Sequence, residues 1–317
     1  MDLERHTEPK TIAAIWEHYE AKRKSEHRPH LGGSQIGNPC ERALFYQFRH
    51  AARPHFEGRT LRLFERGDRE EPVIVSNLRA VGATVWETDP DTGKQISFSA
   101  HGGHFSLSLD GVAEGLPDAP KTVHMLEFKT MSDKNFKALV KDGLQKAKPI
   151  YWAQCQIGMH LSQLDRCAFI AVNKNDDSLY MERVAYDPAE GMALQAKAGK
   201  VIFSDQPPAR LSNDPAHWEC KFCPMHSICH MGQPPEVNCR TCLHSTPLES
   251  GDGDWACAAG RKFGSCTDEC HLYNPYMMDP WQVNDASPEF VEYVTPDGEV
   301  IRNEGNSKEI EKMWIPF

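Results

Sequence analysis

Residues 124–132, "HMLEFKTMS", hold one acid and one base, Glu127 and Lys129, two positions apart in a largely apolar run. Successive side chains of a β-strand point to opposite faces. This spacing therefore places Glu127 and Lys129 on one face of a strand and Leu126 and Phe128 on the other. Such a strand has two interpretations: half of a catalytic site, or the solvent face of a sheet.

The surrounding sequence predicts a mixed α/β or α+β core. A turn-rich linker before residue 122 predicts a hairpin that ends in the 124–132 strand, and Pro72 is expected to break or kink the helix in which it stands. We expect helices at 10–26, 41–50, 61–82, 133–147, 150–163 and 188–203, strands at 83–88, 104–115, 122–130, 165–174 and 179–188, and a C-terminal hairpin over 289–303.

Composition is that of a globular protein: 317 residues, 40% of them hydrophobic and 25% charged. No apolar run approaches the roughly 20 residues that span a bilayer, and the N-terminus lacks the apolar segment of a secretory signal. These features predict a cytoplasmic protein with no membrane partner. The net charge of −10 argues against a polyanion-binding surface overall, but seven arginines between Arg42 and Arg69 and six lysines between Lys129 and Lys148 are either solvated helix faces or a phosphate track.

Carboxylates elsewhere can join the 124–132 strand. Asp110 stands on the polar face of the strand expected to pair with it, so it can converge with Glu127. Glu71 or Glu70 can arrive from the preceding helix. Converging carboxylates suit a hard divalent cation such as Mg²⁺, and the adjacent Lys129 can orient or polarise a water for attack on a phosphodiester.

Cysteine is the strongest compositional signal, because eight of the eleven cysteines lie between Cys220 and Cys270. In a chain without a secretory signal, clustered cysteines favour metal binding over disulfides. One partition is a zinc ribbon formed by Cys220, Cys223, Cys239 and Cys242. It leaves Cys40 and four later cysteines without a role.

Four segments, in this order, resemble the motifs of the PD-(D/E)XK nuclease superfamily, and of its RecB-type exonucleases in particular. They are "RGDREE" (66–71), "LDG" (109–111), "EFK" (127–129) and "YWAQCQIGM" (151–159). The last segment departs from the family pattern, because Gly158 stands where Tyr is usual. Tyr151 is the candidate to replace that aromatic. The resemblance implies a restriction-endonuclease-like core, with a mixed central sheet flanked by helices.

The resemblance also implies residue roles. Asp110 and Glu127, with the carbonyl of Phe128, would hold Mg²⁺ or Mn²⁺, and Glu71 would be a further ligand, direct or through water. The other catalytic residues implied are Lys129, which would act on the attacking water, and Gln154, which would position the strand or the waters. The candidate phosphate contacts to DNA are Arg42, Arg49, Lys134 and Lys137.

"NPCERALFY" (38–46) followed by "WECKFCPMHSIC" (218–229) resembles the iron–sulfur-containing RecB-type nucleases, which include CRISPR-adaptation nucleases and AddB helicase–nucleases. This second partition implies a [4Fe–4S] cluster that staples the two ends of the nuclease core. Its ligands would be Cys40, Cys220, Cys223 and Cys229.

The cysteines that remain predict a second site. The set that fits a tetrahedral zinc ion is Cys239, Cys242, Cys257 and Cys270. Cys266 and His271 compete for the last position, and His244 is a weaker candidate. Cys155 and Cys167 are expected to be packing residues.

The sequence thus predicts a metal-dependent DNA nuclease, an exonuclease of phage or prophage recombination type. The alternatives are a structure-specific endonuclease of the same superfamily and a catalytically inactive, metal-stabilised DNA-binding module. Expected partners besides DNA are a recombinase, a single-strand-binding protein, a helicase or further copies of the chain. The expected organisation is an N-terminal helix (1–30), a nuclease core (31–213), a cysteine cluster closing on Cys40 (214–232), a zinc knuckle (233–277) and an acidic tail with a hairpin (278–317).

Overall fold

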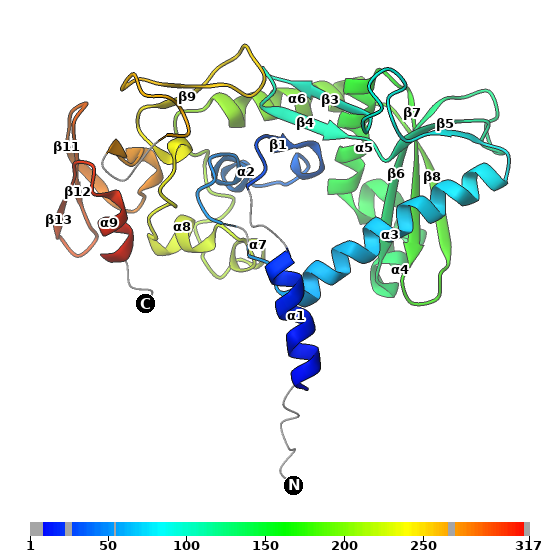
Figure 1. The fold of residues 1–317 in the computed structure, drawn as a ribbon, viewed down its shortest axis with the longest axis horizontal. Coiled ribbons are helices and arrows are strands. Elements are labelled where there is room, and N and C mark those ends of the chain that lie inside the picture. The colour runs from blue at the N-terminus through cyan, green and yellow to red at the C-terminus, as the bar shows by residue number, and fades with distance from the viewer. Residues whose placement is uncertain (1–8, 23–26, 54, 266–269, 314–317) are drawn as a thin grey trace, which may run out of the picture.

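The computed structural model describes residues 9–22, 27–53, 55–265 and 270–313. A five-stranded sheet, on the right in Figure 1, has the strand order β2-β5-β6-β7-β8. β6 and β7 run parallel and the other neighbours antiparallel, which confirms a mixed α/β architecture. The strands are β2 (Thr84–Trp86), β5 (Gly111–Glu114), β6 (His124–Met131), β7 (Arg166–Asn173) and β8 (Leu179–Ala185).

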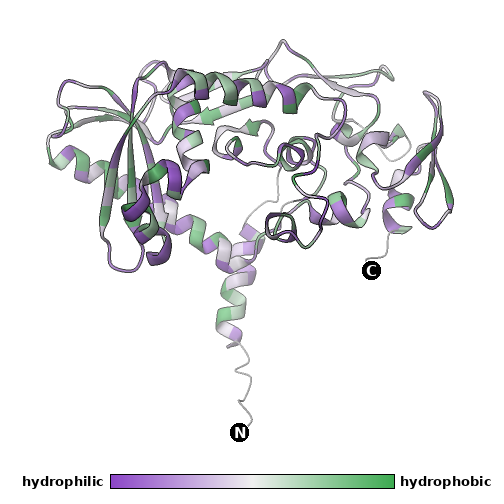
Figure 2. Ribbon diagram, turned by 180° about the vertical axis from the view of Figure 1, so that it is seen from behind, coloured by the Kyte–Doolittle hydropathy of each residue, from purple (hydrophilic) through white to green (hydrophobic). Residues whose placement is uncertain are grey.

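Helices cover both faces of this sheet. α5 packs on the face of β6 from which Met125 enters the main hydrophobic core, and α3 packs on the face from which Leu126 and Phe128 enter a second core (Figure 2). The helices around the sheet are α3 (Gly58–Ala80), α4 (Asp133–Ala147), α5 (Pro149–Ser162) and α6 (Pro188–Phe203). Because β6 is buried on both faces, any charge that it carries needs a partner inside the protein.

The residues expected to form one strand, 104–115, form two strands in different sheets. β4 belongs to a small sheet of order β1-β4-β3, whereas β5 pairs with β2 and β6. The single strand was wrong because the chain breaks at Asp110, whose carboxylate accepts the N–H of Phe128 on β6. The predicted hairpin of β5 with β6 is confirmed. The small sheet consists of β1 (Leu31–Gly32), β3 (Ser97–Ala100) and β4 (Phe105–Ser108).

α3 continues through Pro72, so the helix does not break there. Proline removes one helical hydrogen bond, the one that the Asp68 carbonyl would accept. Beyond it, Ile74 and Val75 are buried in the second core, and this packing stabilises the C-terminal half of α3. The acidic middle of α3, around Glu71, therefore lies beside the C-terminal end of β6.

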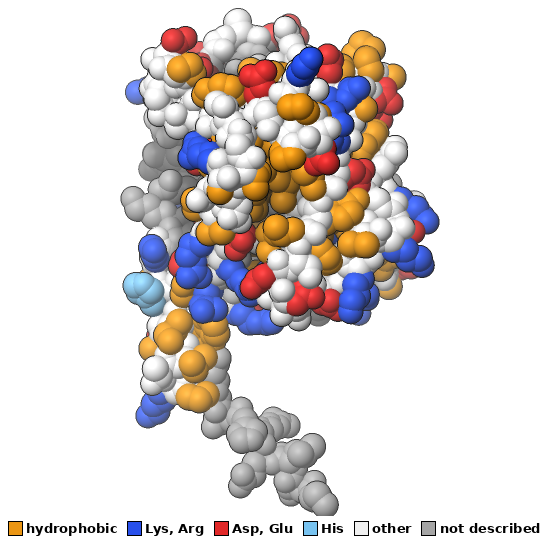
Figure 3. Space-filling model, turned by 90° about the vertical axis from the view of Figure 1, so that its right-hand side faces the viewer, with side chains coloured by type: hydrophobic (Ala, Val, Ile, Leu, Met, Phe, Trp, Pro, Cys, Tyr) orange, Lys and Arg blue, Asp and Glu red, His pale blue; other side chains and the backbone are white. Residues whose placement is uncertain are grey.

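α1 (Lys10–Lys22) is a helix as predicted, and it projects from the body of the molecule (Figures 1 and 3). None of its residues is buried, and Ile12 and Ile15 are 36% and 40% exposed. Glu20 Oε1 accepts the N–H of Gly58 at 2.7 Å, which fixes α1 to the start of α3. None of the helices in the described ranges, α1 included, is long and apolar enough to cross a membrane.

The cysteine-rich region and the tail are built from short elements. The predicted hairpin is confirmed as β12 and β13, and Gly298 at its turn has a φ of +88°, which favours glycine. β11, which was not predicted, adds a third strand, and Tyr293 and Ile310 are buried in a local core. The elements are η1 (Gly33–Gln35), α2 (Glu41–Phe48), α7 (Trp218–Lys221), α8 (His226–Met231), η2 (Cys239–Thr241), β9 (Ser245–Pro247), β10 (Trp255–Cys257), η4 (Pro275–Met277), β11 (Gln282–Ala286), β12 (Val291–Val294), β13 (Val300–Asn303) and α9 (Ser307–Met313).

Candidate active site and cysteine sites

β6 carries Glu127 and Lys129 on the face that α5 covers. The Glu127 side chain is fully buried, and its Oε1 accepts from Lys129 Nζ. Its second oxygen, Oε2, accepts from Gln154 Nε2 of α5 at 2.8 Å. Lys129 Nζ also donates to the Phe128 carbonyl at 3.1 Å. The pair is therefore not the solvent face of a strand, because both of its charges are held by the protein.

Asp110 reaches the same place from the break between β4 and β5. Its Oδ2 accepts the Phe128 N–H at 2.6 Å, and Gly111 lies opposite Leu126 in the register of β5 and β6. Asp110 therefore lies beside the backbone of the residue that follows Glu127. The predicted convergence of the two carboxylates occurs, although Asp110 lies just before its strand and not within it.

Glu71 of α3 completes the acidic group across a cavity of about 640 Å³. α3 supplies one wall of this cavity, the end of β6 a second, and the start of α5 a third. Its lining includes Gly67, Asp68, Glu70, Glu71, Phe128, Lys129, Lys148, Tyr151 and Lys174. We call it the carboxylate cavity.

Burial and mutual repulsion shift the pKa values of the acids upward. Burial, with Asp110 and Asp68 nearby, raises the pKa of Glu71 to about 7. Burial raises the pKa of Glu127 to about 7 although Lys129 opposes the shift. Burial also raises the pKa of Asp110. For Lys129 burial favours the neutral amine, but Glu127 and Asp110 outweigh it, so its pKa is raised and the ammonium persists.

The donor set fits a hard divalent cation. In the described part of the chain, no three His, Cys, Asp or Glu side chains are arranged to hold one ion. The Lys129 ammonium instead neutralises the charge of the Glu127 carboxylate. The raised pKa values of Glu71, Asp110 and Glu127 indicate repulsion that a cation would relieve. Gln154 Oε1 is buried with no protein partner, which leaves an acceptor for a water or an ion ligand.

These shifts predict a pH-dependent stability for the metal-free protein. The folded pKa of Glu127, about 7, lies above its ordinary 4.5, so its stabilising contribution is present below about pH 4.5 and is lost as pH rises through 7. The free energy of unfolding of wild type, taken relative to that of Glu127→Gln at the same pH, should fall by on the order of 3 kcal/mol between about pH 5 and pH 8. Urea unfolding in EDTA measures both proteins. Excess Mg²⁺ should remove most of this difference. A difference that does not change with pH would contradict the prediction.

The aromatic ring beside Lys129 comes from Tyr151, with Lys129 Nζ 5.4 Å from the ring centroid. Gly158, where the family pattern has Tyr, faces the core. A Cβ added there would lie 2.5 Å from Met125 Sδ and 3.2 Å from Leu107 Cδ2. The departure at Gly158 therefore does not remove an aromatic from the site, because Tyr151 supplies one from the previous turns of α5.

Placing a tyrosine at this position should damage the fold. Gly158→Tyr places a whole ring where one carbon already meets Met125, and overpacking of this kind costs roughly 3 kcal/mol or more of unfolding free energy. Chemical denaturation measures the loss. Ala14→Tyr on the exposed α1 is the control and should cost almost nothing. A Gly158→Tyr protein as stable as wild type would show that α5 packs differently.

Two predicted DNA contacts are structural. Arg42 is 7% exposed and bonds to Asp279 at 3.0 Å and the Pro208 carbonyl at 3.1 Å. Arg49 is 1% exposed, and its guanidinium donates to the carbonyls of Ser204 and Arg240. The expectation that Arg42 and Arg49 contact phosphates is corrected, since neither guanidinium faces outward.

Other cations surround the carboxylate cavity. Lys134 and Lys137 of α4 are exposed, and Lys137 pairs with Asp133 at 2.8 Å. Lys148, the last lysine of the predicted phosphate track, lines the cavity itself, and so does Lys174, which was not singled out from the sequence. Lys174 gave no signal, because only the pairing of β7 with β6 brings it there.

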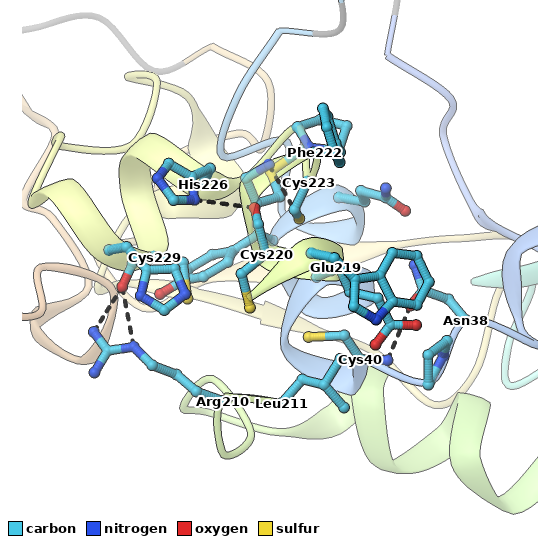
Figure 4. A pocket seen from close by; sticks show the side chains of 18 of the residues that line it. Asn38, Cys40, Arg210, Leu211, Glu219, Cys220, Phe222, Cys223, His226 and Cys229 are labelled. Carbon is cyan, nitrogen blue, oxygen red and sulfur yellow. Dashed lines mark hydrogen bonds between the residues drawn. The ribbon is translucent and has the colours of Figure 1, made fainter. Parts of the chain in front are cut away.

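The first cysteine site is a cavity of about 330 Å³ (Figure 4). Cys40 precedes the first turn of α2, and the others come from α7, α8 and the turn between them. Burial and the neighbouring thiols raise the pKa of Cys223, whose Sγ accepts the N–H of Met225 at 3.4 Å. The four predicted cysteines that line this cavity are Cys40, Cys220, Cys223 and Cys229.

The second cysteine site is a cavity of only about 20 Å³. Cys239 Sγ accepts the N–H of Gly264 at 3.2 Å. His271 lies elsewhere, with its ring nitrogens on Thr241 Oγ1 and Ser307 Oγ, and Cys266 lies outside the described residues. The predicted ligands that line the cavity are Cys239, Cys242, His244, Cys257 and Cys270. Cys155 and Cys167 are buried in the main core, as expected of packing residues.

No protein-family model and no curated protein matches this sequence. Solved structures that resemble part of its fold include an alkaline exonuclease (LHK-Exo) from Laribacter hongkongensis, with 17% identity and a TM-score of 0.41 over 59% of this chain and 90% of that chain. LHK-Exo in complex with dAMP has 15% identity and a TM-score of 0.39 over 60% and 90%. SSO0001 has 15% identity and a TM-score of 0.42 over 70% and 98%. Identities and scores this low assign no activity, which must come from the side chains themselves.

Proposed function

We propose that the chain is a Mg²⁺- or Mn²⁺-dependent DNA nuclease of exonuclease type that hydrolyses phosphodiester bonds in phage-type recombination or repair. The observation that carries the proposal is geometric: Lys129 pairs with Glu127, Asp110 accepts the N–H of Phe128 between them, and Glu71 lines the cavity that Lys129 also lines. A lysine that bridges a buried carboxylate and a backbone carbonyl beside an open cavity suits hydrolysis better than a purely structural role.

A divalent cation on these carboxylates would supply Lewis acidity and activate a water. Gln154 fixes the orientation of Glu127, and the Phe128 carbonyl faces the same place as Lys129 Nζ. Because the Lys129 ammonium persists, it orients the attacking water or stabilises charge that develops on the phosphate, and does not take up a proton. Lys148 and Lys174 on the cavity wall are placed to bind the flanking phosphates.

The test is degradation of end-labelled linear DNA, single- and double-stranded, by the full chain with Mg²⁺, Mn²⁺ or EDTA. An exonuclease shortens linear DNA from its ends and leaves closed circular DNA intact. Cleavage of closed circles would identify the endonuclease alternative. A chain that binds DNA without cutting it under any divalent cation would be the inactive DNA-binding module and would overturn the proposal.

We further propose a [4Fe–4S] cluster at the first cysteine site and a zinc ion at the second. The support is their difference in size, about 330 Å³ against about 20 Å³. A single tetrahedral ion needs ligands only about 2.3 Å from its centre, whereas a cluster needs room for its own iron and sulfide atoms. Anaerobically purified protein should be brown and contain both iron and zinc. Two zinc ions and no iron in that preparation would show that both sites bind zinc and that there is no cluster.

A further inference from the structure

α2 joins the two cysteine sites. Cys40 stands at its N-terminal end, in the first cysteine cavity, and its C-terminal end reaches the segment that carries the second site (Figure 1). The eight residues of α2 span about 12 Å at 1.5 Å per residue. Most of α2 is buried, so a shift at one end is transmitted to the other.

Backbone carbonyls at the C-terminal end of α2 are bound by the residues around Cys239. Arg240 Nη1 donates to the Phe48 carbonyl at 2.9 Å, Asn238 Nδ2 to the His50 carbonyl at 3.0 Å, and the Glu236 N–H to the Ala51 carbonyl at 2.7 Å. The Phe45, Tyr46 and Gln47 carbonyls are paired with the N–H groups of Arg49, Ala51 and His50, so the Phe48 carbonyl is the helix-end acceptor that depends on Arg240. The other two bonds hold the turn that follows α2, at His50 and Ala51.

Aromatic packing ties the other half of the second site to α2. Trp255, two residues before Cys257 on β10, stacks on Phe48 with ring centroids 5.3 Å apart and on Phe263 at 5.3 Å. The Arg240 guanidinium lies 4.9 Å from the Trp255 ring and 5.3 Å from the Phe48 ring. Two of the three chain segments that supply cysteines to the second site, those of Cys239 and Cys257, therefore contact Phe48.

Residues 236–257, which make these contacts with α2 and the turn after it, have little regular structure of their own. β9 and β10 have three residues each, and so has η2. A two-stranded sheet this small is not stable alone in water. Arg240 is buried, and no carboxylate in the described residues pairs with it, so its position depends on the carbonyls and rings that surround it. A metal that joins Cys239 and Cys242 to Cys257 would hold this arrangement closed.

We propose that the second cysteine site is a clamp on α2, and that metal bound there keeps Cys40 in place as a ligand of the first cysteine site. Arg240 is the positioning residue that links the two. The inference rests on the two metal sites proposed above. It is independent of nuclease activity, because its readouts are metal content and thiol reactivity.

The test compares Arg240→Met, Arg240→Lys and Cys242→Ser in the full chain, purified anaerobically, with Arg302→Met on the exposed face of β13 as control. Metal per chain is measured together with the rate at which iodoacetamide modifies Cys40. Arg240→Met should keep the metal of the second site, lose metal from the first, and expose Cys40 to modification roughly tenfold faster, because hydrogen bonds from a charged donor are lost. Arg240→Lys can still donate to one carbonyl. It should therefore keep part of the metal of the first site and part of the protection of Cys40.

Cys242→Ser should empty both sites, and Arg302→Met neither. A Cys242→Ser protein that loses the metal of the second site while the first keeps its metal and Cys40 stays unreactive would overturn the clamp. So would a wild-type chain with no metal at Cys239, Cys242 and Cys257. If the first site takes up no metal, the reactivity of Cys40 alone decides between these outcomes.

Discussion

Replacing Lys129 by methionine is expected to lower the rate of DNA cleavage by roughly 10²–10³-fold, the usual loss when one preorganised charged donor is removed from a site where charge develops. Methionine keeps the length of the side chain but cannot donate to Glu127 or the Phe128 carbonyl. The loss should fall on kcat more than on KM, because Lys148 and Lys174, the proposed phosphate contacts on the cavity wall, are unchanged. Steady-state cleavage of labelled linear DNA in excess Mg²⁺ measures it.

The matched control is Lys121→Met, an exposed lysine in the turn between β5 and β6, which should cleave at the wild-type rate. Circular dichroism should show both variants folded. Lys129→Arg should recover part of the activity, since the charge remains although its geometry differs. Full activity in Lys129→Met would show that this ammonium is a structural counter-charge to Glu127 and that the cleavage site lies elsewhere.

The local pattern predicted the part of the site that one strand and its neighbours determine. The alternation in 124–132 placed Glu127 and Lys129 on one face of β6, and the helices expected at 133–147 and 188–203 have the bounds of α4 and α6. These features depend on periodicity and on nearby turn residues. Asp110 was placed near Glu127 for the same reason, since a short linker nearly forces the two strands to pair.

The parts of the fold and the site that were not predicted depend on contacts between residues far apart in the sequence. Arg42 and Arg49 looked like surface cations, as arginines usually are, but their partners lie more than 150 positions away and cannot be read from their neighbours. The break at Asp110 followed from a bond to the β6 backbone and not from its own sequence. The sequence does not show whether position 158 has room for a side chain, because Met125, which fills that space, lies on β6.

Cys40→Ser is expected to cause a large loss of stability, if the first cysteine site binds its cluster. Cys40 and Cys220 lie about 180 residues apart, and closing so long a loop contributes roughly 4–5 kcal/mol to the unfolding free energy. At 2–4 °C per kcal/mol, the midpoint of thermal unfolding should fall by roughly 8–20 °C. Anaerobic urea unfolding followed by circular dichroism measures the free energy directly.

The contribution of the closed loop can be separated from that of packing around the thiol by removing the metal. Serine is smaller than cysteine, so Cys40→Ser also loses contacts in its half-buried position, and this loss should persist in protein stripped of iron and zinc. The loop contribution should vanish there, because no crosslink then exists in either protein. The expected result is therefore a substitution that costs several kcal/mol in the metal-loaded chain and about 1 kcal/mol in the stripped chain. Equal costs in both would mean that Cys40 is a packing residue and that the ends of the core are joined by side-chain contacts alone.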